Sequence, residues 1–157
     1  MRNRLRQKLT KQQLTLTLVH LHSHAHTHRF PYLDTLLILQ KFGAGAHFFG
    51  FGDEAELDML EELLQREKIL GLFCEFPSNP LLKCANMKRL RLLANLHGFP
   101  IVVDDTLGNF KNIDILPFAD VVVTSLTKVF SGDSNVMGGR CESLISLFAD
   151  NGLSGFL

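Results

Sequence analysis

The stretch V-V-V-T-S-L-T-K-V-F-S-G-D-S-N-V-M-G-G, residues 121–139, begins as a β-branched apolar run and stops at hydroxyls and one lysine. Its three leading valines suit a strand that is buried on both faces, as strands of parallel sheets are. Ser125, Thr127 and Lys128 follow the carboxyl end of that strand, where open α/β sheets bind their ligands. The stretch therefore indicates either a site with an amine beside two hydroxyls or a surface lysine in an ordinary strand-to-helix loop.

Length and composition place the chain among globular proteins. Its 157 residues suffice for one domain with a real core, and 46% hydrophobic against 20% charged residues excludes a disordered chain. Lys+Arg and Asp+Glu number 16 each, so the net charge does not favour nucleic acid, and no apolar run reaches the length of a membrane span. Three cysteines without a CxxC pair favour a reducing compartment, and we expect a cytoplasmic protein.

The first 29 residues differ in character from the rest. They are basic and contain no acidic residue, and residues 20–28 place a histidine at every second position. Such imidazoles would share one face of a strand and could bind zinc or copper. Tetrahedral sites rarely take ligands two residues apart on one strand, however, and no carboxylate or thiolate lies nearby in the sequence. We expect residues 1–29 to be a low-complexity, His-rich segment that is disordered or aberrant, without a metal site.

Two helices are expected from apolar spacing and end signals. One begins after the N-cap Asp53, with Glu56 forming a partial capping box. The other covers residues 86–97 and stops at Gly98. Residues 32–41 also carry apolar side chains at helical spacing. The residues expected to face inward are Leu57, Leu60, Leu63 and Leu64 in the first helix and Met87, Leu90, Leu93 and Leu96 in the second.

Strands alternate with these helices, which is typical of a mainly parallel sheet. They are expected over residues 69–74, 100–103 and 121–123, with a strand or bent loop over 42–52. Asn79, Asp104 and the Ser125–Lys128 group each follow the end of a different strand. Because the carboxyl ends of parallel strands lie along one edge, an amide, a carboxylate, hydroxyls and an amine are expected to converge there.

This set of side chains suits chemistry with pyridoxal 5'-phosphate. A lysine amine can bond covalently to that cofactor, a carboxylate keeps its pyridine nitrogen protonated, and hydroxyls bind its phosphate. The sequence has no G-x-S-x-G and no Walker lysine preceded by spaced glycines, so serine hydrolase and P-loop functions lack support.

Three motifs resemble one known family. E-F-P-S-N-P-L-L (75–82), V-V-D-D-T (102–106) and T-S-L-T-K-V-F-S-G-D-S-N-V-M-G-G (124–139) are similar to the Cys/Met-metabolism family of pyridoxal phosphate enzymes, and within it to fungal cystathionine gamma-synthases. The resemblance keeps a consistent order and spacing from Phe30 to about Gly139. It implies an α/β fold: part of the large domain of a fold type I pyridoxal-phosphate-dependent transferase, over residues 30–140, with a mainly parallel sheet and flanking helices.

The resemblance also implies roles for individual residues. Lys128 matches the lysine that carries the cofactor and moves the substrate's protons, and Asp104 matches the aspartate that pairs with the pyridine nitrogen. Ser125 and Thr127 match the phosphate-binding hydroxyls. Asn79 matches the asparagine near the ring oxygen.

Two further positions matter for the resemblance. Tyr32, the only tyrosine, matches a tyrosine that stacks on the cofactor ring; the alternative is an aromatic residue at a helix start. Asp105 stands where many relatives carry asparagine, which changes the local charge pattern.

The implied family reaction joins an activated homoserine ester with cysteine to give cystathionine, in methionine and cysteine metabolism. Its partners would be small-molecule amino-acid substrates, and the parent family forms homo-oligomers. We expect no nucleic-acid partner and no membrane partner.

Parts of the family pattern are missing. Residues 1–29 hold no glycine for the family's phosphate-binding segment, and Arg140-Cys141-Glu142 interrupts what should continue as a strand, leaving residues 141–157 as a divergent C-terminal tail. We also expect the family's C-terminal domain to be absent. We therefore expect a truncated member. It would be an enzyme only if the missing parts are supplied, and the alternative is an inactive fragment or interaction module that pairs with a full-length paralogue.

Overall fold

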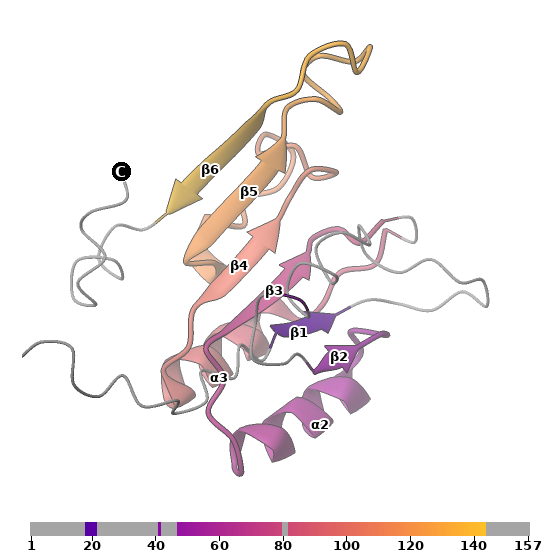
Figure 1. Cartoon of the computed structure of the whole chain (residues 1–157). Helices are drawn as coiled ribbons and strands as arrows, with labels where there is room; N and C mark the ends of the chain where they lie inside the picture. Colours follow the sequence, from indigo (N-terminus) through magenta and orange to yellow (C-terminus); the bar gives the residue numbers. More distant parts are fainter. Residues whose placement is uncertain (1–17, 22–40, 42–46, 80–81, 144–157) are drawn as a thin grey trace, which may run out of the picture.

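The computed structural model describes residues 18–21, 41, 47–79 and 82–143. Six strands in these residues form one sheet in the order β2-β1-β3-β4-β5-β6, and every pairing except β5 with β6 is parallel (Figure 1). The elements are β1 Leu18–Leu21, β2 Phe48–Phe49, α2 Glu54–Leu64, β3 Gly71–Glu75, α3 Met87–His97, β4 Ile101–Asp104, a 3-10 turn Leu116–Phe118, β5 Val121–Ser125 and β6 Gly139–Ser143. The predicted α/β class with a mainly parallel sheet is confirmed.

One face of the sheet forms the hydrophobic core together with both helices. The register places Leu72 of β3 beside Ile101 of β4, and Cys74 beside Val103, and all four are buried. The two-residue period of a strand sends these side chains to the same face. The helices add Leu57, Leu60 and Leu64 from α2 and Met87, Leu90, Leu93 and Ala94 from α3. Full burial of a leucine contributes about 1.5–3 kcal/mol, so this layer fixes the strands that carry the site.

The other face of the sheet is less covered by the described residues. Val121 and Val123 of β5 are half-buried, whereas Val122 between them is buried. The prediction that these valines are buried on both faces is therefore wrong for the described part of the protein. The physical reason is that the buried residues of α2 and α3 belong to the core on the Val122 side.

The first helix begins at its predicted cap, Asp53, and the second begins at a cap that the sequence analysis did not name, Asn86. The side chain of Asp53 accepts an N–H bond at 3.0 Å at the start of α2, and Asn86 accepts one at 3.1 Å at the start of α3. Gly98 ends α3 in the left-handed conformation, with φ of 72°, which glycine adopts without a Cβ penalty. Glu56 departs from the capping box, since it accepts the N–H groups of residues 50–52 and so fixes the entry to α2. No helix in the described ranges is long and apolar enough to cross a membrane.

One inward-facing prediction in α3 is wrong. Leu96 is 75% exposed, whereas Met87, Leu90 and Leu93 are buried as expected. Residues spaced by three drift steadily around a helix of 3.6 residues per turn, and Leu96 lies two and a half turns after Met87, on the opposite side. Ala94, which the sequence analysis did not select, is buried in its place.

Two strands differ from what the sequence analysis expected. Residues Leu18–Leu21 lie inside the segment expected to be disordered or aberrant, but they form a strand, β1. This strand pairs with β2 on one side and with β3 on the other. The prediction that residues 140–142 interrupt a strand is also wrong, because β6 runs through them to Ser143. Polar residues are compatible with β6 because it is paired only with β5 in the described sheet and its side chains are partly exposed. The division into residues 1–29, 30–140 and 141–157 stays a prediction.

Predictions for residues 22–40 lie outside the described residues. They include Tyr32 and most of the histidine tract, while Lys41, at the end of the expected helix over 32–41, is helical.

A charge network joins the two helices. The guanidinium of Arg89 in α3 bonds to the carboxylates of Glu54, Asp58 and Glu61, all on α2, with the Glu54 and Glu61 contacts at 2.8 Å. Hydrogen bonds from Asn86 and from Arg89 lower the pKa of Glu54 below its usual value of 4.5. A carboxyl with a lowered folded-state pKa stabilises the fold above its unfolded pKa and loses that contribution as pH falls below it.

An Arg89→Met chain is expected to unfold at a lower urea concentration than the wild type at pH 7, because three neighbouring carboxylates on α2 lose their common cation. The difference should shrink as pH falls below about 4.5, because Glu54, whose pKa Arg89 helps to lower, then loses the charge that Arg89 pairs with. Urea titrations at pH 7 and below this value measure it. Arg66→Met is the control, since the Arg66–Glu62 pair is over 70% exposed on both sides and contributes little. A pH-independent Arg89 difference would contradict the account.

The three cysteines are expected to react with a thiol reagent at different rates. Complete burial raises the pKa of Cys74 to about 12, with the negative charges of Glu75 and Asp104 adding to the effect, whereas Cys84 and Cys141 are exposed. Because the thiolate is the nucleophile, two thiols should titrate in the folded chain and the third only after unfolding in urea. Three rapidly reacting thiols in the folded chain would contradict this packing of β3.

Candidate functional site

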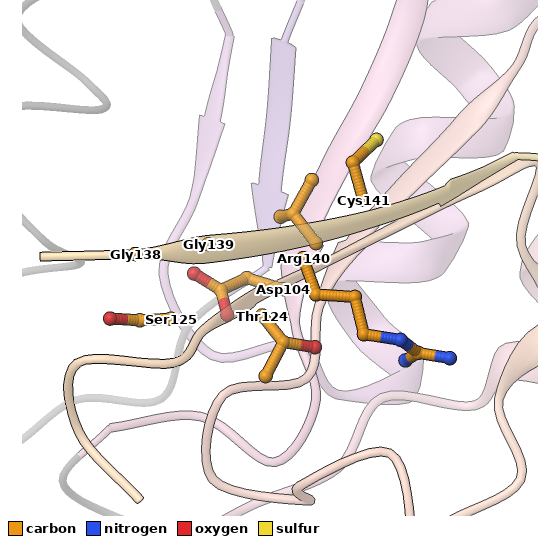
Figure 2. A pocket seen from close by; sticks show the side chains of 8 residues that line it. Asp104, Thr124, Ser125, Gly138, Gly139, Arg140 and Cys141 are labelled. Atoms are coloured by element: carbon orange, nitrogen blue, oxygen red, sulfur yellow. The ribbon is translucent and has the colours of Figure 1, made fainter. Parts of the chain in front are cut away.

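A cavity of about 370 Å³ lies where β4 and β5 end and β6 begins. Asp104 and Ser125 line it from the carboxyl ends of neighbouring parallel strands, and Gly138 and Gly139 line it from the start of β6. In Figure 2, Asp104 and Ser125 lie next to the Gly138–Gly139 backbone, and the guanidinium of Arg140 points away from them. The structure thus brings together two residues that the sequence analysis placed at one sheet edge.

The carboxylate of Asp104 is held on one oxygen. Its Oδ1 atom accepts the N–H of Thr106 at 2.9 Å and the hydroxyl of Thr106 at 2.5 Å. No described residue bonds to Oδ2. One oxygen of a strand-end carboxylate therefore remains available at a cavity of small-molecule size.

The loop after β5 folds back against the start of β6. The N–H groups of Leu126 and Thr127 donate to the carbonyl of Gly138 at 2.9 and 3.3 Å, and the Thr127 hydroxyl accepts the N–H of Gly138 at 3.0 Å. The hydroxyl of Ser125 has no hydrogen bond with the residues that the structure describes. Ser125 can therefore bind a ligand oxygen, whereas Thr127 already holds the loop beside the cavity.

The remaining predicted site residues lie around this cavity or beyond the described structure. Lys128 is exposed three residues after Ser125, and its ammonium group has no hydrogen bond or ion pair within the described ranges. Asn79 follows β3, whose last residue is in register with Asp104, and its N–H donates to Glu75 at 3.1 Å. Neither Lys128 nor Asn79 lines the cavity. Tyr32 lies outside the described residues.

Sequence reasoning missed the polar residues that support the site. Asp105 is buried, and its carboxylate accepts the Thr124 hydroxyl and, at 3.0 Å, the N–H of Phe110. Thr106 also supports the site, since its hydroxyl bonds to the carboxylate of Asp104. The sequence carried a signal for this contact, because threonine hydroxyls often bond to nearby groups at turns and Thr106 is only two residues after Asp104. The Asp105–Thr124 contact had no such signal, because it joins the residue after β4 to a residue of β5 that lies 19 positions further along the chain.

The carboxylate of Asp105 thus bonds to neighbouring residues of the protein. A second set of contacts, made by Arg140, lies nearby. The Arg140 guanidinium lies 4.5 Å from the centre of the Phe110 ring and pairs with Glu142. These contacts fasten the loop after β4 to β6 rather than entering the cavity.

A family model for Cys/Met metabolism PLP-dependent enzymes matches residues 18–144 of the chain. The match begins at β1 and ends one residue after β6, so it covers every strand described here.

Several of the similar relatives are fungal proteins. A cystathionine gamma-synthase-like enzyme of Amanita muscaria is 54% identical over an alignment of 118 residues, and the match covers 70% of this chain and 20% of that protein. A cystathionine gamma-synthase of Neurospora crassa is 57% identical over 112 residues, 70% of this chain and 18% of that protein. The Saccharomyces cerevisiae cystathionine gamma-synthase is 54% identical over 111 residues. The chain spans about a fifth of the length of the curated relatives it matches.

Solved structures agree on the fold. Cystathionine gamma synthase from Xanthomonas oryzae, in complex with aminoacrylate and cysteine, has a TM-score of 0.64 at 24% identity, covering 88% of this chain and 34% of that one. A putative O-acetylhomoserine (thiol)-lyase from Campylobacter jejuni, which carries a pyridoxyl-lysine monophosphate, has a TM-score of 0.62 at 25% identity, covering 85% and 31%. Because the family model matches most of its length, the chain belongs to the Cys/Met metabolism family of PLP-dependent enzymes.

Proposed function

We propose that this chain binds pyridoxal 5'-phosphate and contributes to a trans-sulfuration reaction like that of cystathionine gamma-synthase. The reaction would join an activated homoserine ester with cysteine, so the partners are small-molecule amino acids. A cytoplasmic location and assembly into homo-oligomers belong to the same proposal. The observation that carries it is the pair Asp104 and Ser125, which line one cavity with Lys128 three residues further on.

The residues at the cavity fit the cofactor. A protonated pyridine nitrogen requires an acceptor, and Oδ2 of Asp104 has no partner among the described residues. A phosphate requires donors, and the Ser125 hydroxyl is available beside the turn that leads to Lys128. Thr127 supports this position indirectly, through its bonds to Gly138.

Each residue would have a distinct part in the reaction. Pyridoxal phosphate, when bound, supplies an electron sink for the carbanion formed on the amino acid. The amine of Lys128 would hold the cofactor at rest and then move protons at the α- and β-carbons of the homoserine substrate, as its flexible four-carbon stem allows. Asp104 would keep a negative charge at the ring nitrogen. The ester group would leave the γ-carbon, and the sulfur of cysteine would add there.

The first test is titration of the purified full-length chain with pyridoxal phosphate, followed by visible absorbance. The proposal predicts a saturable band characteristic of a lysine-bound cofactor. The chain's circular dichroism spectrum serves as the control for folding. Folded chain that gains no band at any cofactor concentration would contradict the proposal.

A second candidate function is an inactive interaction module that pairs with a full-length relative. The exposed apolar side chains of the β5–β6 loop favour it, since Phe130 is 81% and Met137 is 93% exposed. Mixing the chain with a purified fungal cystathionine gamma-synthase should then yield a stable complex in gel filtration, weakened by the double change Phe130→Ser and Met137→Ser. Elution of the two proteins at their separate positions would exclude this candidate.

A further inference from the structure

We infer that Thr106 is a positioning residue, which holds the carboxylate of Asp104 and ties it to the backbone of Ser125. The inference deepens the proposed function, because Asp104 and Ser125 are the residues proposed for the ring nitrogen and the phosphate. It rests on how the ladder between β4 and β5 ends.

The backbone ladder between β4 and β5 is interrupted at Asp105. The N–H of Asp105 donates to the carbonyl of Val123 at 3.0 Å, and the next bond of a parallel ladder would join the N–H of Ser125 to the carbonyl of Asp105. That carbonyl instead accepts the N–H of Asn109 at 2.7 Å, because the chain turns after β4. The Ser125 amide therefore needs another acceptor.

The hydroxyl of Thr106 is that acceptor. Its Oγ1 accepts the N–H of Ser125 at 2.8 Å, and an amide can only donate. The hydroxyl hydrogen is then free to point to Oδ1 of Asp104, 2.5 Å away. A single side chain thus replaces a missing ladder bond and donates to the carboxylate.

The consequence is a carboxylate with a fixed orientation. Two donors from Thr106, its N–H and its hydroxyl, hold Oδ1, while Oδ2 has no partner among the residues that the structure describes. The Ser125 N–H is used by Thr106, so Ser125 has its hydroxyl to offer to a ligand. Thr106 therefore sets the distance between the two ends of the proposed cofactor site.

Two variants separate the hydroxyl from the shape of the side chain. Thr106→Val keeps the volume and removes the hydroxyl, and Thr106→Ser keeps the hydroxyl. We expect Thr106→Val to bind pyridoxal phosphate on the order of tenfold more weakly, as the loss of a charge-assisted hydrogen bond implies, and Thr106→Ser to bind like the wild type. Equal affinities of all three chains would overturn the inference.

An analogue with carbon in place of the ring nitrogen shows whether the effect acts through Asp104. Thr106→Val should lose less affinity for this 1-deaza analogue than for pyridoxal phosphate, because the analogue gives Asp104 nothing to accept and only the link to Ser125 is lost. General damage to the site would weaken both ligands equally, and that result would also overturn a positioning role. Urea midpoints of both variants show whether they are folded.

Amide hydrogen exchange tests the same link without any cofactor. The Ser125 amide should be protected in the wild type and in Thr106→Ser, and exchange faster by at least tenfold in Thr106→Val. Unchanged protection in Thr106→Val would overturn the inference. A wild-type chain that shows this pattern but binds no pyridoxal phosphate would contradict the proposed function and leave the role of Thr106 supported.

Discussion

A Lys128→Ala chain is expected to form no covalent bond with pyridoxal phosphate and to gain none of the visible absorbance that the wild-type chain gains on titration. The effect is complete rather than partial, because the proposed bond requires an amine at this position. Lys128 lies in the turn after β5, three residues beyond Ser125 of the cavity. Absorbance titration and mass measurement after borohydride reduction check the result.

Two controls separate the nucleophile from its charge and from other lysines. Lys128→Arg keeps the positive charge but cannot lose a proton to become a nucleophile, so it should behave like Lys128→Ala. Lys111→Ala removes another exposed lysine, which lies in the loop after β4, and should behave like the wild type. A Lys128→Ala chain that still gains the full band would show that the cofactor bonds elsewhere.

An Asp120→Ala chain is expected to be less stable than the wild type by about 3 kcal/mol. Oδ2 of the buried Asp120 accepts the N–H of Ile101, the first residue of β4, at 2.7 Å and Nη1 of Arg91 at 2.8 Å. The backbone N–H of Asp120 also donates to the carbonyl of Ile101 at 2.8 Å. The substitution leaves a buried strand amide without its partner and Arg91 without its ion pair.

Urea unfolding followed by circular dichroism measures this loss. Glu62→Ala is the matched control, because its ion pair with Arg66 has a 3.7 Å separation and lies on the surface. We expect its stability to change by less than about 1 kcal/mol. The double variant Asp120→Ala with Arg91→Met should recover part of the loss, since it removes the partly buried unpaired charge. Equal midpoints for Asp120→Ala and Glu62→Ala would contradict the account of how β4 begins.

Local signals in the sequence predicted much of the fold. The predicted cap Asp53 acts on an amide three residues away, and the predicted stop Gly98 ends its own helix, so a single stretch of sequence contains all the partners. Leu96 shows the limit of the same reasoning, because spacing by three identifies an apolar face over only about two turns.

Non-local pairing explains the structural features that the sequence analysis missed. β6 forms by pairing with β5 across an intervening loop, and its Arg140, Cys141 and Glu142 carry no strand signal of their own. β1 likewise depends on neighbours on both sides.

The candidate site likewise has features that the sequence predicted and features that it did not. Asp104 and Ser125 could be placed at one edge because parallel strands end together, and the structure gives them a common cavity. The link from Thr106 to the Ser125 amide could not be predicted, since it depends on a backbone carbonyl that is diverted to Asn109. The positions of Lys128 and Asn79 beyond the cavity lining depend on loop conformation rather than on strand order.

Peptide mapping of the full chain after borohydride reduction with one equivalent of pyridoxal phosphate tests the central claim most directly. The account predicts that the reduced cofactor is found on the peptide that contains Lys128, and that excess inorganic phosphate, which would compete at Ser125, lowers its yield there. Labelling spread evenly over the exposed lysines, or concentrated on Lys111, would contradict a pyridoxal phosphate site at the ends of β4 and β5.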